Sequence, residues 1–150
     1  MIRKACMRDV PEIHKLINEF AEKGIMLPRS LGRLYDDLRD FYIFEQDGHV
    51  GGTVAVHFIW DGLAEIRSLA VRESLQGHGV GRQLVERGIE DARSFDCARA
   101  FTLTYVPGFF QKLGFHQIDK SGLPHKIWAD CVNCPKFPNC DEIALVLDLK

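Results

Sequence analysis

The sequence predicts a mixed α/β domain built around a central β-meander. Apolar residues recur at helical spacing near the N-terminus and after residue 80, and three strand-like segments follow one another between residues 41 and 71. Aspartate–glycine pairs at 47–48 and 61–62 separate those segments, and such pairs are typical of tight turns between antiparallel strands. No repeat or linker-like segment divides the 150 residues, so we expect a single domain over residues 1–150.

The first part of the chain is expected to contain one short strand and two helices. Residues 2–5 have the composition of a strand. Asp9 is the expected N-cap of the first helix, with Glu12 reaching back to it as in a capping box. Ser30 is the expected N-cap of a second, shorter helix that carries Leu31, Leu34 and Leu38.

The strands of the meander are expected at 41–45, 50–60 and 63–71. In the second of them the even-numbered positions, from Val50 to Trp60, are mostly apolar, and they are predicted to form one face of the strand. The third is apolar enough to occupy the centre of a sheet.

The remaining elements alternate between helix and strand. A helix is expected over about 81–94, a strand at 98–104, and a short helix at 107–113 that ends at Gly114, a favourable C-terminal cap residue. The fold class is therefore α/β (α+β), with a mixed, mostly antiparallel central sheet of six to seven strands flanked by about four helices. The last strands are expected at 115–119 and 142–149.

Composition argues against several classes of protein. The net charge is −2 and no basic face is evident, which disfavours a nucleic-acid-binding protein. The longest apolar stretch, 50–60, is much shorter than the roughly 20 residues of a membrane span. The N-terminus lacks a secretory signal and the cysteines number five, so we expect a cytoplasmic location with reduced thiols.

A glycine-rich segment carries the clearest chemical signal. The strand at 63–71 leads into Gln76-Gly77-His78-Gly79-Val80-Gly81-Arg82, where a helix begins. The first N–H groups of a helix lack internal partners, and the helix dipole places partial positive charge there. Glycines let this backbone approach a diphosphate and Arg82 adds a cation, although a plain helix-entry turn would use the same residues. The segment follows a meander, unlike the glycine loop of a dinucleotide-binding fold.

Two segments resemble the signatures of the GNAT acetyltransferase superfamily. Residues 76–81 match its coenzyme A signature, and Phe110-Gln111-Lys112-Leu113-Gly114-Phe115 matches its second hallmark, Y-x-K-L-G-F. The resemblance implies a single GNAT N-acetyltransferase domain, an acyltransferase that moves acetyl from acetyl-CoA to an amine by direct attack in a ternary complex. Shorter matches resemble the N-acetylglutamate synthases (amino-acid N-acetyltransferases) of arginine biosynthesis, which implies the α-amine of L-glutamate as acceptor; they lie at 27–30, 64–71, 103–104, 109–110 and 123–126.

The same resemblance implies how the cosubstrate binds. The strand ending at residue 71 is expected to splay from the strand at 98–104, so that the pantetheine arm enters the gap. Backbone N–H groups at Leu69, Ala70 and Val71 would hold the arm and the thioester oxygen, as preorganised dipoles do in other acyl-transfer sites. Phe109 and Phe110 are expected to form a wall beside the pantetheine.

Glu65 is the expected general base, because it matches the carboxylate position of the family just before the coenzyme site. The alternative is that Glu65 only pairs with Arg67, two residues along on the same face. The tyrosine of the second hallmark is Phe110 here, so its role as general acid is vacant. Tyr105 is the nearest candidate acid, with packing as the alternative, and Thr104 is assigned to the substrate site.

A glutamate acceptor carries two carboxylates, so its site should contain cations. Arg29 is the first candidate because a guanidinium binds a carboxylate with two hydrogen bonds, and Arg67 and Lys126 are the others. The alternative for each is a solvated surface charge. The six histidines are spread along the chain, and none forms a recognisable nucleophile–base pair.

A cysteine-rich segment contains Cys131, Cys134 and Cys140. Thiolates at this spacing are able to bind zinc, with His125 or Asp141 as fourth ligand, but three cysteines without a second pair favour free or redox-sensitive thiols and no required metal. Cys6 and Cys97 lie in expected core elements.

Other functions stay open at this stage. They are an acetyltransferase for a protein or other small amine, a non-catalytic acyl-CoA-binding regulator, and a zinc-bound interaction module. The expected partner is a small-molecule amine, without nucleic acid or membrane. A homodimer paired through the last strand is a further expectation.

Overall fold

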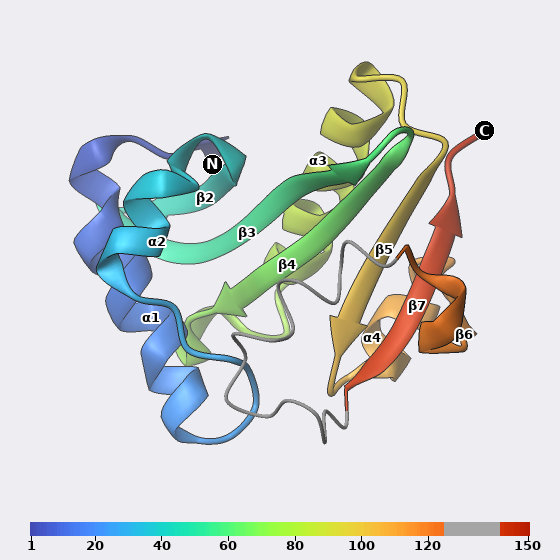
Figure 1. Ribbon diagram of the computed structural model, residues 1–150. Coiled ribbons are helices and arrows are strands. Elements are labelled where there is room, and N and C mark those ends of the chain that lie inside the picture. The colour runs from blue at the N-terminus through green and yellow to red at the C-terminus, as the bar shows by residue number, and fades with distance from the viewer. Residues whose placement is uncertain (125–141) are drawn as a thin grey trace.

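The computed structural model describes residues 1–124 and 142–150, which form one seven-stranded sheet with helices on both faces (Figure 1). The strand order is β1-β2-β3-β4-β5-β7-β6, and neighbouring strands are antiparallel except for β4 and β5, which are parallel. The predicted fold class is confirmed. The strands are β1 (Ile2–Lys4), β2 (Phe41–Gln46), β3 (His49–Trp60), β4 (Leu63–Val71), β5 (Arg99–Thr104), β6 (His116–Ile118) and β7 (Ile143–Asp148).

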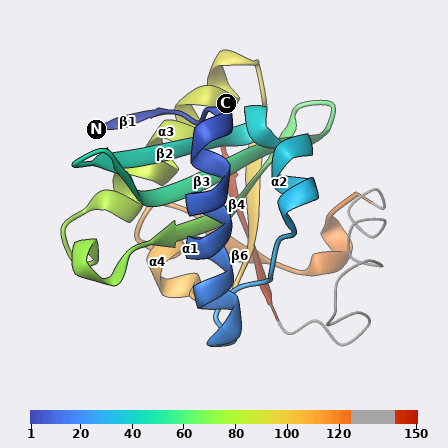
Figure 2. The ribbon, with the colours of Figure 1, turned by 90° about the vertical axis from the view of Figure 1, so that its left-hand side faces the viewer.

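Four α-helices lie in the described part of the chain, and they divide between the two faces of the sheet. Figure 2 shows α1 crossing in front of β2, β3 and β4, with α3 behind them. The apolar side of α1 packs on Ala55 of β3, whereas that of α3 packs on Val54 and Val56. Alternate residues of β3 therefore face different helices. The helices are α1 (Val10–Glu22), α2 (Leu31–Asp36), α3 (Val80–Ser94) and α4 (Pro107–Gln111).

The first helix begins where the sequence predicted, but the predicted capping box is wrong. The Asp9 side chain accepts hydrogen bonds from the backbone N–H of Cys6 at 2.7 Å and from the Arg3 guanidinium at 2.8 and 3.0 Å, and it makes no cap bond to α1. Glu12 instead accepts the N–H of Val50 at 2.7 Å. Asp9 therefore binds residues that precede it in the chain, including the backbone N–H at the start of the 3-10 helix over Met7–Asp9, whereas Glu12 is bound by a strand that only the tertiary fold brings near.

The second helix keeps its predicted cap. The Ser30 hydroxyl accepts the N–H of Arg33 at 3.2 Å, as an N-cap serine does. The helix ends at Asp36, so Leu38 lies in a separate 3-10 helix over Leu38–Asp40 rather than in α2.

The prediction that the even-numbered residues of β3 form one face is wrong, because Val50 packs on the α1 side and Val54 and Val56 on the α3 side. Residues 50–56 are buried on both faces because helices cover both sides of the sheet. Near the end of the strand the pairing with β4 shifts, and Ile59 is 3% exposed while Phe58 and Trp60 are 41% and 63% exposed. A β-bulge reverses which residues face the core, and it does so here.

The last strand is not available for pairing across a dimer, contrary to the prediction. β7 lies between β5 and β6, so both of its edges already have partners. The edges of the sheet are β1 and β6. None of the described helices has the length and apolar character that crossing a membrane would require.

Candidate active site

β4 and β5 are paired at one end and separate toward the other (Figure 1). The pairing joins residues 63–65 to 99–101 and stops at Glu65 and Phe101. Beyond it, β5 continues with β7 as its partner. The opening between residues 66–71 of β4 and 102–104 of β5, here called the fork, confirms the predicted splay.

The closed end of the fork is fixed by a buried side chain. Thr102 is 2% exposed, and its hydroxyl donates to the carbonyl of Ile66 at 2.8 Å. This bond spans the two strands directly after their last residue pair. It holds the vertex of the fork next to Glu65.

Ser68 is an extra residue in β4. The pairing with β3 shifts between residues 67 and 70, and Ser68 has a φ of 55° in the left-handed region. Such a bulge exchanges the faces of the residues that follow it. Leu69 and Val71 therefore pack on the α3 side of the sheet and Ala70 on the α1 side. These three residues, predicted to bind the cosubstrate, lie along the edge of β4 that borders the fork.

The glycine-rich turn leads from β4 to the N-terminus of α3. Residues 76–79 are exposed, and Gly77 and Gly79 have φ values of 80° and 83°, which favour glycine. The N-cap of α3 is Gly79, and no side chain accepts a hydrogen bond from the first N–H groups of this helix. The turn is tied to the strand by Gln76, whose Nε2 donates to the carbonyl of Val71 at 2.9 Å.

The turn has the room that a diphosphate needs. A Cβ at Gly77 would meet nothing within 4 Å, and one at Gly79 would meet only the Gln83 amide at 4.0 Å. His78 is exposed between the two glycines. The geometry fits the anion-binding role of a helix N-terminus.

Gly81 and Arg82 lie at the start of α3. A Cβ at Gly81 would lie 3.4 Å from the Phe109 ring and 3.6 Å from Val71, so this glycine lies where α3 packs against these two side chains. The Arg82 side chain is 68% exposed and pairs with Glu86 at 2.7 Å. Its charge lies at the surface beside the turn.

The aromatic residues predicted as a wall divide into two roles. Phe110 is 3% exposed and packs edge-on against Phe115, with ring centroids 5.4 Å apart, so it belongs to the core. Phe109 is partly buried and lies against Gly81. Of the predicted pair, Phe109 alone keeps a surface that a ligand is able to contact.

Thr104 and Tyr105 lie at the open end of β5. The Thr104 hydroxyl oxygen accepts the N–H of Val106 at 3.0 Å, and the residue is 7% exposed. This bond stabilises the turn that follows the strand. Tyr105 directly follows Thr104, the last residue of β5.

Charged side chains gather on the α1–α2 face of the sheet. Asp37 Oδ2 lies 2.8 Å from Arg29 Nη2 and 3.4 Å from Arg67 Nη2, and Arg67 Nη1 lies 3.4 Å from Glu65 Oε1. The predicted alternative for Glu65, an ion pair with Arg67, is therefore present. All four side chains are less than one-fifth exposed, so these are not solvated surface charges. With Asp40 and His57 we call this group the polar cluster.

Asn18 of α1 positions Arg29. Its amide donates to the Arg29 carbonyl at 2.9 Å, and its side-chain oxygen accepts the Arg29 N–H at 3.2 Å. Burial lowers the pKa of Arg29, and the nearby Arg67 cation lowers it further, whereas Asp37 acts in the opposite direction. The buried Nε of Arg29 has no hydrogen-bond partner among the described residues. A buried, unsatisfied guanidinium donor is an indication that a further acceptor binds there.

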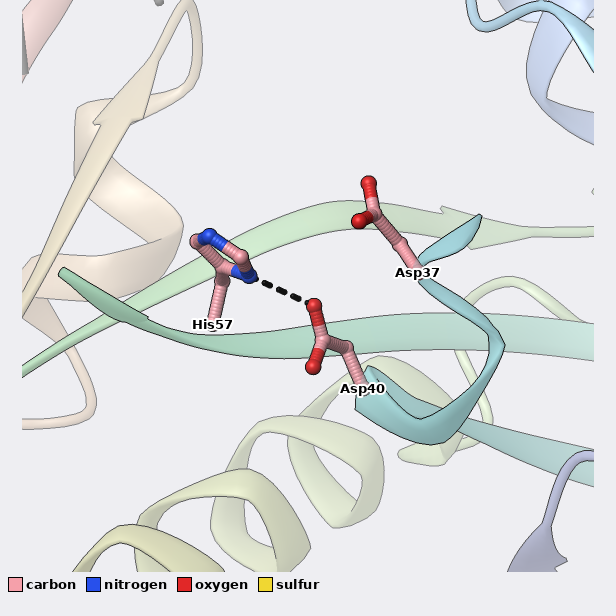
Figure 3. A group of neighbouring side chains, drawn as sticks. All are labelled: Asp37, Asp40 and His57. Atoms are coloured by element: carbon pink, nitrogen blue, oxygen red, sulfur yellow. Dashed lines mark hydrogen bonds and ion pairs between the residues drawn. The ribbon is translucent and has the colours of Figure 1, made fainter. Parts of the chain in front are cut away.

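His57 and Asp40 complete the polar cluster (Figure 3). His57 Nδ1 lies 2.6 Å from Asp40 Oδ2, and His57 is the cross-strand partner of Glu65. Sequence reasoning missed both residues, and it missed Asp37. The available signal was a histidine, His57, within a mostly apolar strand, and it does not reveal its partner 17 residues earlier.

Asp37, Asp40 and His57 place three potential metal-ligand atoms within 4.8 Å of one another. Asp37 already binds two guanidinium groups through Oδ2, and their positive charges repel a metal cation. This group is therefore a poor metal site. Lys126 and the predicted thiolate group, Cys131, Cys134 and Cys140, lie outside the described residues.

The two cysteines within the described residues, Cys6 and Cys97, differ in burial. Cys97 is 5% exposed, in agreement with a packing role, but Cys6 is exposed rather than in the core. Burial raises the pKa of the Cys97 thiol.

Comparisons with known proteins agree with this geometry. A family model described as acetyltransferase (GNAT) family matches residues 8–115. An uncharacterised N-acetyltransferase of Chlorobaculum tepidum is 41% identical over 148 residues, which cover 99% of this chain and 96% of that protein. An amino-acid acetyltransferase of Mycobacterium tuberculosis is 37% identical over 122 residues, which cover 79% of this chain and 70% of that protein.

A solved structure shares the whole fold. The crystal structure of N-acetylglutamate synthase from Neisseria gonorrhoeae, complexed with coenzyme A and N-acetyl-glutamate, matches with a TM-score of 0.91 at 31% identity. The match covers 100% of this chain and 35% of that one. The chain belongs to the GNAT family and is an acetyl-CoA-dependent N-acetyltransferase.

Proposed function

We propose that the protein acetylates the α-amine of an amino acid with a second carboxylate, with L-glutamate as the preferred acceptor. The observation that carries the proposal is the pair of buried arginines, Arg29 and Arg67, beside the fork. The amino-acid acetyltransferase relatives and the synthase complexed with N-acetyl-glutamate support it. The same proposal assigns the protein to arginine biosynthesis.

The arginines suit a dicarboxylate for an electrostatic reason. Burying a guanidinium is costly unless it is paired, and Asp37 is shared between Arg29 and Arg67. An incoming carboxylate supplies the acceptor that the buried Arg29 Nε lacks within the described residues. Lys126, which lies outside the described residues, is proposed as an additional cation.

The fork and the turn hold the cosubstrate in this proposal. The backbone of Leu69–Val71 binds the arm and the carbonyl oxygen, Phe109 flanks the arm, and the turn at 76–82 binds the diphosphate. Acetyl-CoA supplies a thioester whose carbonyl carbon is the electrophile. Thr104 lies where the acceptor would enter the fork.

Glu65 is the proposed proton acceptor closest to the amine. It lies at the vertex of the fork on the same face as Arg67, so an amino acid held by the arginines places its amine near this carboxylate. An α-ammonium must lose a proton before its nitrogen is able to attack. Tyr105, directly after β5, is the proposed donor of a proton to the leaving sulfur.

A thiol-release assay with acetyl-CoA tests the acceptor. We expect turnover with glutamate, weaker turnover with aspartate and glutamine, and none above background with lysine or polyamines. Turnover with lysine or polyamines but not glutamate would contradict the proposed acceptor while leaving the acetyltransferase assignment intact. Coenzyme binding without turnover of any amine would favour a non-catalytic acyl-CoA-binding regulator.

The role of Glu65 is tested by Glu65→Gln, which keeps shape and removes the carboxylate. We expect kcat to fall by about 10²- to 10³-fold with coenzyme affinity unchanged, within the range that general bases contribute. Glu90→Gln, the same change at an exposed position of α3, is the matched control. Equal kcat and equal pH dependence in the two variants would remove Glu65 from the mechanism.

A further inference from the structure

His57 is held by Asp40 in one defined orientation. His57 Nδ1 lies 2.6 Å from Oδ2 of Asp40, which is the last residue of the 3-10 helix after α2 (Figure 3). A carboxylate accepts hydrogen bonds and does not donate them, so Nδ1 carries the proton and Nε2 of the neutral ring is the acceptor. A histidine fixed in this way is ready to take a proton at Nε2.

His57 lies where it is able to receive a proton from Glu65. The two residues are Cα partners on β3 and β4, so their side chains project from the same face of the sheet. Directly opposite residues of antiparallel strands have Cβ atoms about 5 Å apart, a distance that two long side chains span easily. Glu65 itself lies at the vertex of the fork.

The charged side chains around His57 carry a net negative charge. The groups around it are Asp37 and Asp40 from the segment after α2, Glu65 and Arg67 from β4, and Arg29 through Asp37. Two guanidinium charges therefore face three carboxylates, and one negative charge is left over. A proton that arrives in the cluster during turnover therefore meets a net negative charge.

We propose that His57, oriented by Asp40, accepts the proton that the substrate ammonium gives up, with the Glu65 carboxylate as the intermediate carrier. This inference rests on the proposed function, because it needs an amine held between the arginines and the fork. The His57 side chain is 33% exposed, so it returns the proton to solvent after each turnover. The Glu65 carboxylate is only 12% exposed and has less access to water for this purpose.

The proton and electron balance is complete with these groups. One N–H bond of the ammonium breaks, and its proton moves to Glu65 and then to Nε2 of His57. The free amine then forms the nitrogen–carbon bond while the carbon–sulfur bond breaks, and the sulfur keeps that electron pair. A second proton leaves the nitrogen as the amide forms, and the sulfur takes up one proton to become the thiol.

The test uses the full chain with His57→Gln and with His49→Gln as matched control. His49 is on the same strand and its Nδ1 also lies against a carboxylate, Glu12, at 3.3 Å, but it is exposed and lies eight residues along the strand from the partner of Glu65. For His57→Gln we expect kcat at pH 7 to fall about 10²-fold with the KM values for acceptor and acetyl-CoA unchanged. The acid limb of its kcat profile moves to higher pH, because the amine must then be deprotonated by solvent.

Two further variants separate proton transfer from a structural role. His57→Ala leaves space at a partly exposed position, and we expect added imidazole to restore part of its activity in a concentration-dependent way. In the Asp40→Asn variant no carboxylate fixes the orientation of the His57 ring. We expect kcat to fall in this variant, but by less than in His57→Gln. Thermal unfolding of each variant checks that it is folded.

Three results would overturn the inference. A His57→Gln variant with the wild-type pH profile excludes His57 as the acceptor, even if its activity is low. A folded His57→Ala variant that imidazole does not restore, together with an unshifted profile in His57→Gln, leaves only a structural role. Absence of wild-type turnover with every amine tested overturns the proposed function as well, whereas active wild-type enzyme with an unaffected His57→Gln overturns this inference alone.

Discussion

Replacing Arg29 by lysine keeps the positive charge and removes the planar guanidinium. Arg29 Nη2 bonds Asp37 at 2.8 Å, and its buried Nε has no partner among the described residues. A lysine ammonium reaches Asp37 as a point charge but does not present two parallel donors to a carboxylate. We therefore expect the fold to survive and the binding of the acceptor to weaken.

The size of the effect follows from the bonds that are lost. A hydrogen bond to a charged group contributes about 1.5 to 3 kcal/mol, and a two-donor contact reduced to one weaker contact loses about 3 kcal/mol. Since 1.4 kcal/mol corresponds to a factor of ten, KM for glutamate should rise about 10²-fold. The KM for acetyl-CoA should not change, because the turn proposed to bind its diphosphate is on other elements.

Arg33→Lys is the matched control for this prediction. Arg33 is an exposed residue of α2 whose charge acts on Arg29, so both variants replace a guanidinium by an ammonium in the same region and keep the positive charge. Burial lowers the pKa of Arg29 and will also lower that of a lysine placed there, so the assay is run near pH 7, where the ammonium stays protonated. Initial rates are measured against glutamate and against glutamine.

The comparison of substrates shows which carboxylate Arg29 binds. If it binds the side-chain carboxylate, the preference for glutamate over glutamine disappears in Arg29→Lys; if it binds the α-carboxylate, both substrates lose affinity alike. A KM for glutamate in Arg29→Lys equal to that in Arg33→Lys would refute the reasoning, because the buried guanidinium would then have no part in acceptor binding.

Three further predictions concern the frame of the site. Asp9→Asn is expected to lower the free energy of unfolding by about 2 kcal/mol, and Tm by about 4 to 8 °C, because Asp9 accepts two hydrogen bonds from Arg3. Arg3 lowers the pKa of Asp9, so this stabilisation is present above about pH 4 and is lost as the pH falls through the lowered value; Tm curves for wild type and variant should converge in acid. Gly77→Ala and Gly48→Ala both force alanine to a positive φ, 80° and 78°, so each should lower the free energy of unfolding by about 1 to 2 kcal/mol. Calorimetry should show weaker coenzyme A binding only for Gly77→Ala. Cys97, 5% exposed and with its pKa raised by burial, should resist iodoacetamide in the folded protein and react once unfolded, as mass spectrometry of the alkylated peptides would report.

The elements of the fold could be predicted because their signals are local. The apolar spacing of α1 and α3, the Ser30 cap and the turn pairs of the meander act between residues that are neighbours along the chain. The glycine-rich turn was equally visible, since it is built from consecutive residues. The capping box predicted for α1 failed for two different reasons. Asp9 binds residues that precede it, at the start of the neighbouring 3-10 helix, and Glu12 binds a strand that is distant in the sequence.

The site depended on features that have no local signal. The bulge at Ser68 moves Leu69 and Val71 to the face opposite Arg67, although an uninterrupted strand would have kept all three on one face. The position of β7 between two strands was decided by pairing across the chain. His57 and Asp40 come together only because β3 packs beside the segment after α2.

By itself the sequence determined the helices, the meander, the glycine-rich turn and the family. Each of these depends on short sequence segments in which the interacting residues are close neighbours along the chain. Tertiary structure alone decided which charges meet. The polar cluster takes its members from the loop before α2, the segment after it, and two strands of the sheet. The strength of an electrostatic interaction depends on the distance between the charges and on their burial, and neither quantity can be read from the positions of the residues along the chain.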